Sequence, residues 1–331
     1  MSNNNILNAL LKAQTQLESQ PEEEQGIFLI RSANQTLEEA SKRPDPAPLW
    51  KSLWYEGELS CLFSDSNLGK SIYAVQIAEE VSKTGRSVIY FDFEQSDKQF
   101  QLRYTDKSQH LHVFPNSFYR AELGYTYMDS ETIEETIIQG LEEAISQVDA
   151  KVLIIDNLTF LCTATESGDI AGSLMRHFKN FAKKNKLSIL IIAHTPKRDM
   201  SQPITQNDLA GSKKLFNFFD SVFAIGKSAQ AENIRYIKQI KVRHGQYEFG
   251  QNNVIVCEIR KEDSMTALVE IGTGKEKEHL KAYQENKEIM EEELKQITAL
   301  QQQGKNQREI AKLLNMSQAT VNRRIKNNNK N

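Results

Sequence analysis

The chain has 331 residues, a hydrophobic content of 39% and a formal net charge of −3, enough for one large α/β domain with small appendages. No apolar run approaches the ~20 residues that a helix needs to cross a bilayer, and Met1–Asn5 lacks the basic and then apolar layout of a signal peptide. Cys61, Cys162 and Cys257 are too few and too scattered for a disulfide framework or a zinc site. We therefore expect a cytoplasmic protein that stays reduced and has no membrane partner.

The first 45 residues are polar and prone to form helix. Their apolar positions fall in one stripe, at Ile6, Leu7, Leu10 and Leu11. Three prolines then end any helix and indicate a linker: Pro44, Pro46 and Pro48. We expect residues 1–45 to form a helical N-terminal segment followed by this linker.

Residues 46–275 alternate short β-rich runs with helical patterns, which predicts an α/β domain with a mainly parallel sheet. The clearest strands are Leu59–Phe63, Ser87–Phe93, Lys151–Ile155, Ser188–Ala193 and Ser221–Ile225. Three later strands have no helix between them and predict an antiparallel extension of the sheet: Ile234–Val242, Val254–Ile259 and Ala267–Ile271.

A phosphate-binding loop is predicted between the first of these strands and the helix after it. The segment matches G-x-x-x-x-G-K-[ST], except that Ser64 replaces the first glycine. Backbone N–H groups of such a loop and the positive end of the helix bind phosphates. Gly69 permits close approach, Lys70 reaches the β- and γ-phosphates, and Ser71 ligates Mg²⁺. We expect ATP and Mg²⁺ as cofactors, with the nucleotide bound by Ser64, Asp65, Ser66, Asn67, Leu68, Gly69, Lys70 and Ser71.

A second acidic contact for the metal is expected at the end of another buried strand. The run Lys151–Ile155 is followed directly by Asp156. Open α/β sheets bind their ligands at the carboxyl edge of the strands, where this aspartate would lie. Asp156 is therefore the predicted second ligand of Mg²⁺, and an aspartate that caps the next turn is the alternative.

The strand after the P-loop helix ends in Glu94, and this position resembles the RecA/DnaB superfamily. In that superfamily the glutamate at this position polarises the attacking water, and the resemblance implies the same role for Glu94. Asp92 points to the other side of the strand and is the less favoured base. Arg103 lies nine residues beyond Glu94, where DnaB-type helicases often have an arginine that stacks on adenine. A solvated helix residue is the alternative for Arg103.

Two later motifs extend the resemblance over residues 46–274. His194 ends a strand where the superfamily places a γ-phosphate sensor, and histidine there resembles the RepA-type hexameric replicative helicases of plasmids. Lys241 and Arg243 resemble the K-x-R-x-G motif of DnaB-type helicases, which reaches the neighbouring subunit's γ-phosphate. The alternative for His194 is a structural histidine. The alternative for Lys241 and Arg243 is a strand whose basic face is exposed to solvent. The resemblance implies a RecA-like core that assembles as a homo-oligomer, and we expect a hexameric ring.

Two loops of such ATPases line the central channel and contact single-stranded DNA. Their counterparts here are Thr163–Asp169 and Lys197–Lys214. The second loop carries four basic residues that can neutralise phosphates: Lys197, Arg198, Lys213 and Lys214. An ordinary solvated loop is the alternative.

Residues 276–331 predict a linker helix and a helix-turn-helix. Residues 305–331 contain seven basic residues and one acidic residue. This excess of positive charge is typical of nucleic-acid contacts, although a solvated tail shows it too. Two short helices around a tight turn resemble the motif that reads the major groove. The residues predicted to meet base edges are Gln318, Thr320 and Arg323, and those predicted to meet phosphate are Arg324 and Lys326. A module that docks a protein partner is the alternative.

Together these features predict a DNA-dependent ATPase, a ring-forming helicase or DNA translocase of a plasmid or other mobile element. Single-stranded DNA would lie in the channel and duplex DNA at the helix-turn-helix. Two other functions remain open on the sequence. One is an ATP-gated initiator or regulator that binds DNA and does not unwind it, and the other is a KaiC- or recombinase-like ATPase that does not translocate.

Overall fold

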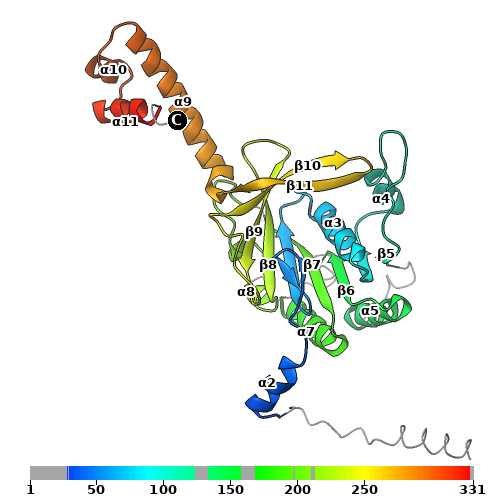
Figure 1. Cartoon of the computed structure of the whole chain (residues 1–331). Coiled ribbons are helices and arrows are strands. Elements are labelled where there is room, and N and C mark those ends of the chain that lie inside the picture. Colours follow the sequence, from blue (N-terminus) through cyan, green and yellow to red (C-terminus); the bar gives the residue numbers. More distant parts are fainter. Residues whose placement is uncertain are drawn as a thin grey trace, which may run out of the picture. The chain divides into compact units, whose positions relative to one another are not determined.

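The computed structural model describes residues 28, 30–123, 133–157, 168–196, 198–209 and 213–328 (Figure 1). The chain divides into two units, Met1–Asp45 and Pro46–Asn331. In the first unit, helix α2 (Ala33–Ser41) begins after Ser32, whose Oγ accepts the backbone N–H of Gln35 at 3.1 Å. The apolar stripe predicted at residues 6–11 lies outside the described residues.

The second unit is built on a nine-stranded sheet in the described part of the chain, with the order β11-β10-β9-β8-β3-β7-β6-β4-β5. Six neighbouring strands run parallel: β3 (Leu59–Ser64), β4 (Val88–Asp92), β5 (Phe118–Ala121), β6 (Val152–Asp156), β7 (Ser188–His194) and β8 (Ser221–Lys227). Three strands extend the sheet in antiparallel fashion: β9 (Ile234–Lys241), β10 (Val254–Glu262) and β11 (Met265–Gly274). The predicted α/β class, with its parallel sheet and antiparallel extension, is confirmed.

Helices cover both faces of the sheet, so the inner parallel strands are buried on both sides. Successive side chains of β7 alternate, so that Ile189 and Ile191 pack with α5 (Ile133–Val148) and α7 (Gly168–Asn185). Leu190 and Ile192 face the other way and pack with α3 (Lys70–Lys83). Strands buried on both faces read as continuous hydrophobic runs, which is why the sequence identified them. Short helices of this unit include α4 (Asp97–Arg103), η2 (Gln206–Asp208) and α8 (Lys213–Phe216).

A small antiparallel pair, β1 (Pro48–Trp50) and β2 (Trp54–Tyr55), precedes the main sheet. Trp54 is fully buried. The ring of Tyr55 packs on Gly245, where a Cβ would lie 2.5 Å from the tyrosine hydroxyl. Gly245 also has a φ of +84°, so both its backbone and this contact require glycine.

The C-terminal helices are α9 (Lys281–Gln302), α10 (Gln307–Leu313) and α11 (Gln318–Asn328). They share a small core of their own, made by Ile297, Ile310, Ala311 and Val321. Asn306 caps α10 in a reciprocal capping box with Glu309. Asn315 has a φ of +51° in the tight turn before α11, a left-handed conformation that asparagine tolerates. No helix within the described ranges is both long and apolar enough to cross a membrane.

The segment between the sheet and α9 is packed into the core. The short helix η3 (Glu276–His279) buries both of its end residues. The Glu276 carboxylate accepts the backbone N–H of Ile204 at 2.7 Å and the ammonium of Lys238 at 2.5 Å. Glu276 thus contacts the core from just beyond the boundary expected at 275/276, and that boundary stays a prediction.

Candidate active site

The predicted phosphate loop joins β3 to α3 at the carboxyl edge of the sheet. Gly69 directly precedes α3 and has a φ of +95°, and Asn67 has a φ of +61°. A Cβ at Gly69 would lie 3.1 Å from the side chains of Ile259 and Leu268, which belong to β10 and β11. The loop thus needs glycine here for its backbone and for its fit beneath these strands. Ser66 and Asn67 are exposed at the tip of the loop, and Leu68 is buried.

Ser64 stands where the usual pattern has glycine, and its surroundings explain why serine fits. It is the last residue of β3 and pairs in register with His194 of β7. An extended strand position has no need of the left-handed backbone that glycine provides. The side chain is buried, and its hydroxyl donates to the carbonyl of Asp65 at 2.9 Å. The Asp65 carboxylate in turn accepts the hydroxyl of Thr195 at 2.9 Å.

Lys70 begins α3 and turns its ammonium back into the loop. Nζ donates to the carbonyls of Ser64, at 3.0 Å, and Asp65, at 2.8 Å. Burial lowers the pKa of Lys70 to about 8, and the nearby carboxylates of Asp156, Glu94 and Asp65 counteract part of that effect. A buried cation held by two carbonyls can strengthen its interactions by meeting an anion such as phosphate.

Asp156 ends β6 beside this lysine and is 1% exposed. The hydroxyl of Tyr90 donates to its Oδ2 at 2.7 Å. Burial raises the pKa of Asp156 to about 6, against the opposing effect of the hydroxyls of Ser71 and Tyr90. Its Oδ1 is buried and, among the described residues, has no partner in good hydrogen-bonding geometry. A buried carboxylate oxygen without a partner, next to a serine hydroxyl, fits the hard oxygen ligands that Mg²⁺ prefers.

Glu94, Asn157 and His194 meet at the ends of three neighbouring parallel strands. The side-chain amide of Asn157 donates a short hydrogen bond to Glu94 Oε1 and lies 3.0 Å from His194 Nε2. His194 Nε2 is 3.7 Å from Glu94 Oε1. Burial and the charge of Lys70 lower the pKa of His194, against the opposing effect of the Glu94 carboxylate, and so favour the neutral imidazole. The amide nitrogen of Asn157 is a donor, so Nε2 accepts from it in the tautomer that carries the ring proton on Nδ1, which is buried and has no hydrogen-bond partner within the described residues.

Asn157 was missed as a site residue by reasoning from sequence. The one local signal was its position directly after Asp156 at a strand end. Its two partners in the site, Glu94 and His194, are 63 and 37 residues away along the chain.

The combination of this loop, its strand-end carboxylates and the parallel sheet agrees with comparison to known proteins. Residues 30–200, just over half of the chain, match the model of the AAA domain family. The chain belongs to the AAA domain family. Its sheet and its P-loop are those of a RecA-like P-loop ATPase.

Curated relatives of this AAA domain chain carry the name DNA repair protein RadA. The protein from Chlamydia trachomatis is 24% identical over 194 residues, which are 57% of this chain and 37% of that protein. The protein from Halalkalibacterium halodurans is 26% identical over 195 residues, with the same two shares. The protein from Campylobacter jejuni is 26% identical over 213 residues, 62% of this chain and 40% of that one. The AAA domain chain thus spans about two fifths of the length of the curated relatives it matches.

Arg103 lies at the end of α4 in the AAA domain. Its backbone carbonyl accepts the hydroxyl of Thr266 from β11 at 3.2 Å. The guanidinium lies near the hydroxyl of Tyr104, and its buried NH1 has no hydrogen-bond partner within the described ranges. The predicted stacking of Arg103 on adenine stays a prediction.

Lys241 and Arg243 lie at the opposite edge of the sheet from the P-loop. Lys241 pairs with Val222 at the start of β8, the edge where β3 also begins. A strand of six residues spans about 20 Å, so neither side chain can reach the loop of its own chain. Lys241 Nζ donates to the carbonyl of Phe216 at 3.2 Å, and the guanidinium of Arg243 lies 2.6 Å from Asp220 Oδ1.

The predicted channel loops are described only in part. Lys197 and residues 163–167 lie outside the described residues, as do the side chains of Lys213 and Lys214. The side chain of Arg198 is 8% exposed, donates to the carbonyl of Gln202 and lies 3.8 Å from Asp208. Contact with a phosphate would require Arg198 to leave these partners. In the structure its side chain instead contacts other residues of its own loop, which the sequence did not suggest.

The C-terminal helices present some of the predicted DNA-binding residues and bury another. Gln318, Arg323 and Lys326 are exposed. Thr320 contributes to the start of α11, where its backbone N–H donates to Ser317 Oγ at 3.1 Å. The Arg324 guanidinium lies 2.6 Å from Glu293 of α9 and its side chain is only 13% exposed. Arg324 therefore ties α11 to α9, in contrast to its expected contact with phosphate.

Proposed function

We propose that this chain binds Mg²⁺-ATP at the carboxyl edge of its sheet and hydrolyses it. The observation that carries the proposal is the meeting of Lys70, Asp156, Glu94 and His194 at that edge, where strands β3, β4, β6 and β7 end. Lys70 would bind the β- and γ-phosphates, and Ser71 with Asp156 would hold the metal. Bound Mg²⁺ would neutralise charge that develops on the transferred phosphoryl group.

Glu94 is the proposed base, which takes a proton from the water that attacks the γ-phosphate. The amide of Asn157 donates to Oε1 of this carboxylate, and Oε2 would be the oxygen that takes the proton. His194 contacts the same amide through Nε2, so it would sense the γ-phosphate indirectly, through the Asn157 amide that links it to Glu94. Loss of the Glu94 carboxylate would therefore slow turnover strongly but leave nucleotide binding in place.

We further propose that DNA is the partner of this ATPase. Its relatives are named DNA repair proteins. The three C-terminal helices have their own core and expose basic residues on α11, which supports a helix-turn-helix that binds duplex DNA. Arg324 is excepted from the proposed phosphate contacts because Glu293 holds it.

The finer proposal is a homo-hexameric ring that moves along single-stranded DNA as a helicase or translocase. Lys241 and Arg243 lie at the edge of the sheet opposite the P-loop of their own chain, and this supports action on the nucleotide of a neighbouring subunit. A cation inserted in trans stabilises the charge of phosphoryl transfer. Asp220 would hold Arg243 until the neighbour arrives.

The rate of ATP hydrolysis with and without single-stranded DNA tests this function, alongside a strand-displacement assay. Stimulated hydrolysis together with displacement supports the motor. The separate C-terminal core with its exposed Gln318 and Arg323 also favours a second function, an ATP-gated initiator that binds one duplex site. Tight binding to a particular duplex without any displacement would favour that initiator. Hydrolysis absent under all conditions would reject the ATPase itself.

A further inference from the structure

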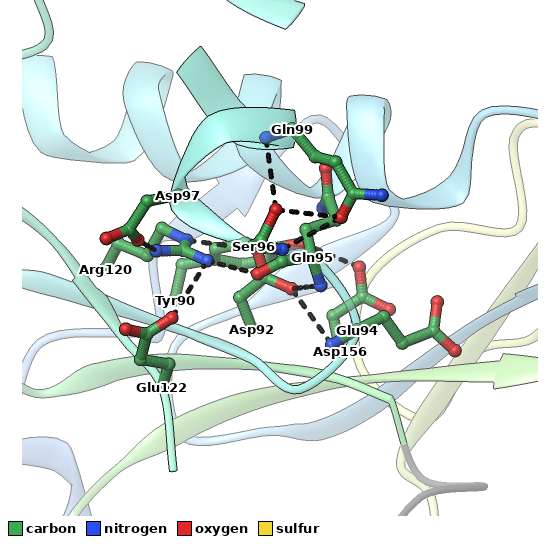
Figure 2. Close-up of polar contacts among 10 residues, drawn as sticks. All are labelled: Tyr90, Asp92, Glu94, Gln95, Ser96, Asp97, Gln99, Arg120, Glu122 and Asp156. Carbon is green, nitrogen blue, oxygen red and sulfur yellow. Dashed lines mark hydrogen bonds and ion pairs between the residues drawn. The ribbon is translucent and has the colours of Figure 1, made fainter. Parts of the chain in front are cut away.

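We propose that Arg120 and Asp92 form a clamp that positions the Glu94 carboxylate for attack by water. This inference rests on the proposed ATPase function and adds two positioning residues to it. Figure 2 shows the two side chains facing each other beneath the turn that leads from β4 to α4. Neither residue is expected to touch nucleotide, so both would act through Glu94.

Asp92 is the inner half of the clamp. It is the last residue of β4, and its side chain is fully buried. Oδ1 accepts the backbone N–H groups of Glu94, at 3.2 Å, and Gln95, at 3.0 Å. A single carboxylate oxygen thus fixes the backbone of the turn from which the Glu94 side chain departs. Asp92, the less favoured candidate for the base, therefore holds the backbone that carries Glu94.

Arg120 is the outer half and comes from β5, the edge strand beside β4. Its Nε donates to Asp92 Oδ2 at 3.0 Å, its NH2 to the carbonyl of Gln95 at 2.6 Å, and its NH1 to Asp97 at 2.5 Å (Figure 2). The guanidinium also lies 5.1 Å from the ring of Phe100. One planar group therefore joins the strand end, the turn and the start of α4.

The geometry of arginine is required for this set of contacts. A guanidinium presents its donors in a rigid fork, whereas a lysine ammonium is a point charge on a flexible stem. Lysine can keep the charge beside the buried Asp92, but it cannot reach three acceptors on different elements at once. The turn would then lose the bonds that the guanidinium makes to Gln95 and Asp97, and Glu94 would be positioned less accurately.

A mispositioned base affects the chemical step far more than it affects binding. The phosphates would be held by the loop around Lys70, which follows β3 and not β4. The Lys70 ammonium bonds the carbonyls of Ser64 and Asp65 in that loop. Displacement of a catalytic group by about 1 Å is enough to slow a reaction by roughly 10²-fold. We therefore expect Arg120→Lys to lower kcat about 10- to 100-fold with nucleotide affinity changed less than about twofold.

The test measures kcat and the affinity for a fluorescent ATP analogue in the full chain, with single-stranded DNA present. The variants are Arg120→Lys and Glu94→Gln, alone and combined, with Arg86→Lys as the matched control. Arg86 is also an arginine paired with a carboxylate, Glu56, and it lies at the other end of β4. Slow turnover by Glu94→Gln is followed under single-turnover conditions. If Arg120 acts through Glu94, the combined variant is no slower than Glu94→Gln.

Asp92→Asn with Arg120→Met keeps the test valid if Arg120→Lys unfolds. This pair removes both charges together and leaves no unpaired buried carboxylate. It too should lose kcat and keep nucleotide affinity. Wild-type kcat in a folded Arg120 variant, or a loss that is equally large with and without Glu94→Gln, would overturn the clamp while the ATPase function stands. A wild-type protein that does not hydrolyse ATP would instead reject the proposed function, and the clamp with it.

Discussion

Nucleotide binding should draw a proton onto Lys70. Burial lowers the pKa of this ammonium to about 8 in the ligand-free protein. Phosphate charge favours the protonated form, so a bound nucleotide raises that pKa again. Lysine that has lost its proton before binding must regain it on binding. The expected sign is therefore uptake of a proton, and nucleotide affinity should decline as pH rises above about 8.

The size of the uptake follows from the pKa. With a ligand-free pKa of about 8, the uptake should be about 0.1 proton per nucleotide at pH 7, about 0.5 at pH 8 and about 0.9 at pH 9. Phosphate groups of the nucleotide are fully ionised across the upper part of this range and add little. Isothermal titration calorimetry in buffers with different ionisation enthalpies measures this quantity directly.

Two variants separate Lys70 from other sources of protons. Lys70→Arg keeps a positive charge that does not titrate in this range, so its uptake should vanish. Lys83→Met is the control at the far end of the same helix, because Lys83 has a raised pKa and stays protonated at pH 9. Uptake that is absent in the wild type at pH 9, or that survives in Lys70→Arg, would refute the reasoning.

Three further predictions concern other parts of the molecule. Asp156→Asn should stabilise the ligand-free protein by roughly 3 kcal/mol above pH 6, because there a buried carboxyl whose pKa is raised from 3.8 to about 6 is ionised. The gain in stability should fade as the pH drops toward 4. Thermal unfolding that shows equal shifts at pH 8 and pH 4 would contradict this prediction. Mixing Arg243→Ala and Glu94→Gln subunits should restore part of the hydrolysis at interfaces that pair two intact halves, whereas mixed rings without any rescue would argue for a role of Arg243 within its own chain. Deleting residues 303–331 should leave basal hydrolysis intact and abolish preference for a particular duplex, measured by binding at one fixed salt concentration, and loss of basal hydrolysis would show that these helices belong to the ATPase unit.

The proposed nucleotide site could be predicted from the sequence because each of its main residues is recognisable from its neighbours along the chain. Each of Lys70, Asp156 and His194 follows a buried apolar strand, and strand ends of a parallel sheet gather at one edge. The parallel sheet and its antiparallel extension were likewise predicted from apolar runs. Strand β5 (Phe118–Ala121) escaped notice because it has only four residues, is half-buried and contains an arginine.

Contacts between distant side chains could not be read from the sequence. The partner of Arg120 in β4 lies 28 residues earlier, and that of Arg324 in α9 lies 31 residues earlier. A basic residue on a loop or helix looks alike in sequence whether it faces solvent, a phosphate or a carboxylate of its own chain. For this reason Arg198 and Arg324 were assigned to DNA, whereas the structure shows both held by neighbours within the protein.

The most direct test of the central claim compares nucleotide binding with turnover in Glu94→Gln. Glutamine keeps the shape of Glu94 and still accepts the amide of Asn157, but it cannot take a proton from water. The variant should bind ATP with an affinity close to that of the wild type and hydrolyse it at least about 100-fold more slowly. Turnover at the wild-type rate would place the base elsewhere and contradict the proposed site.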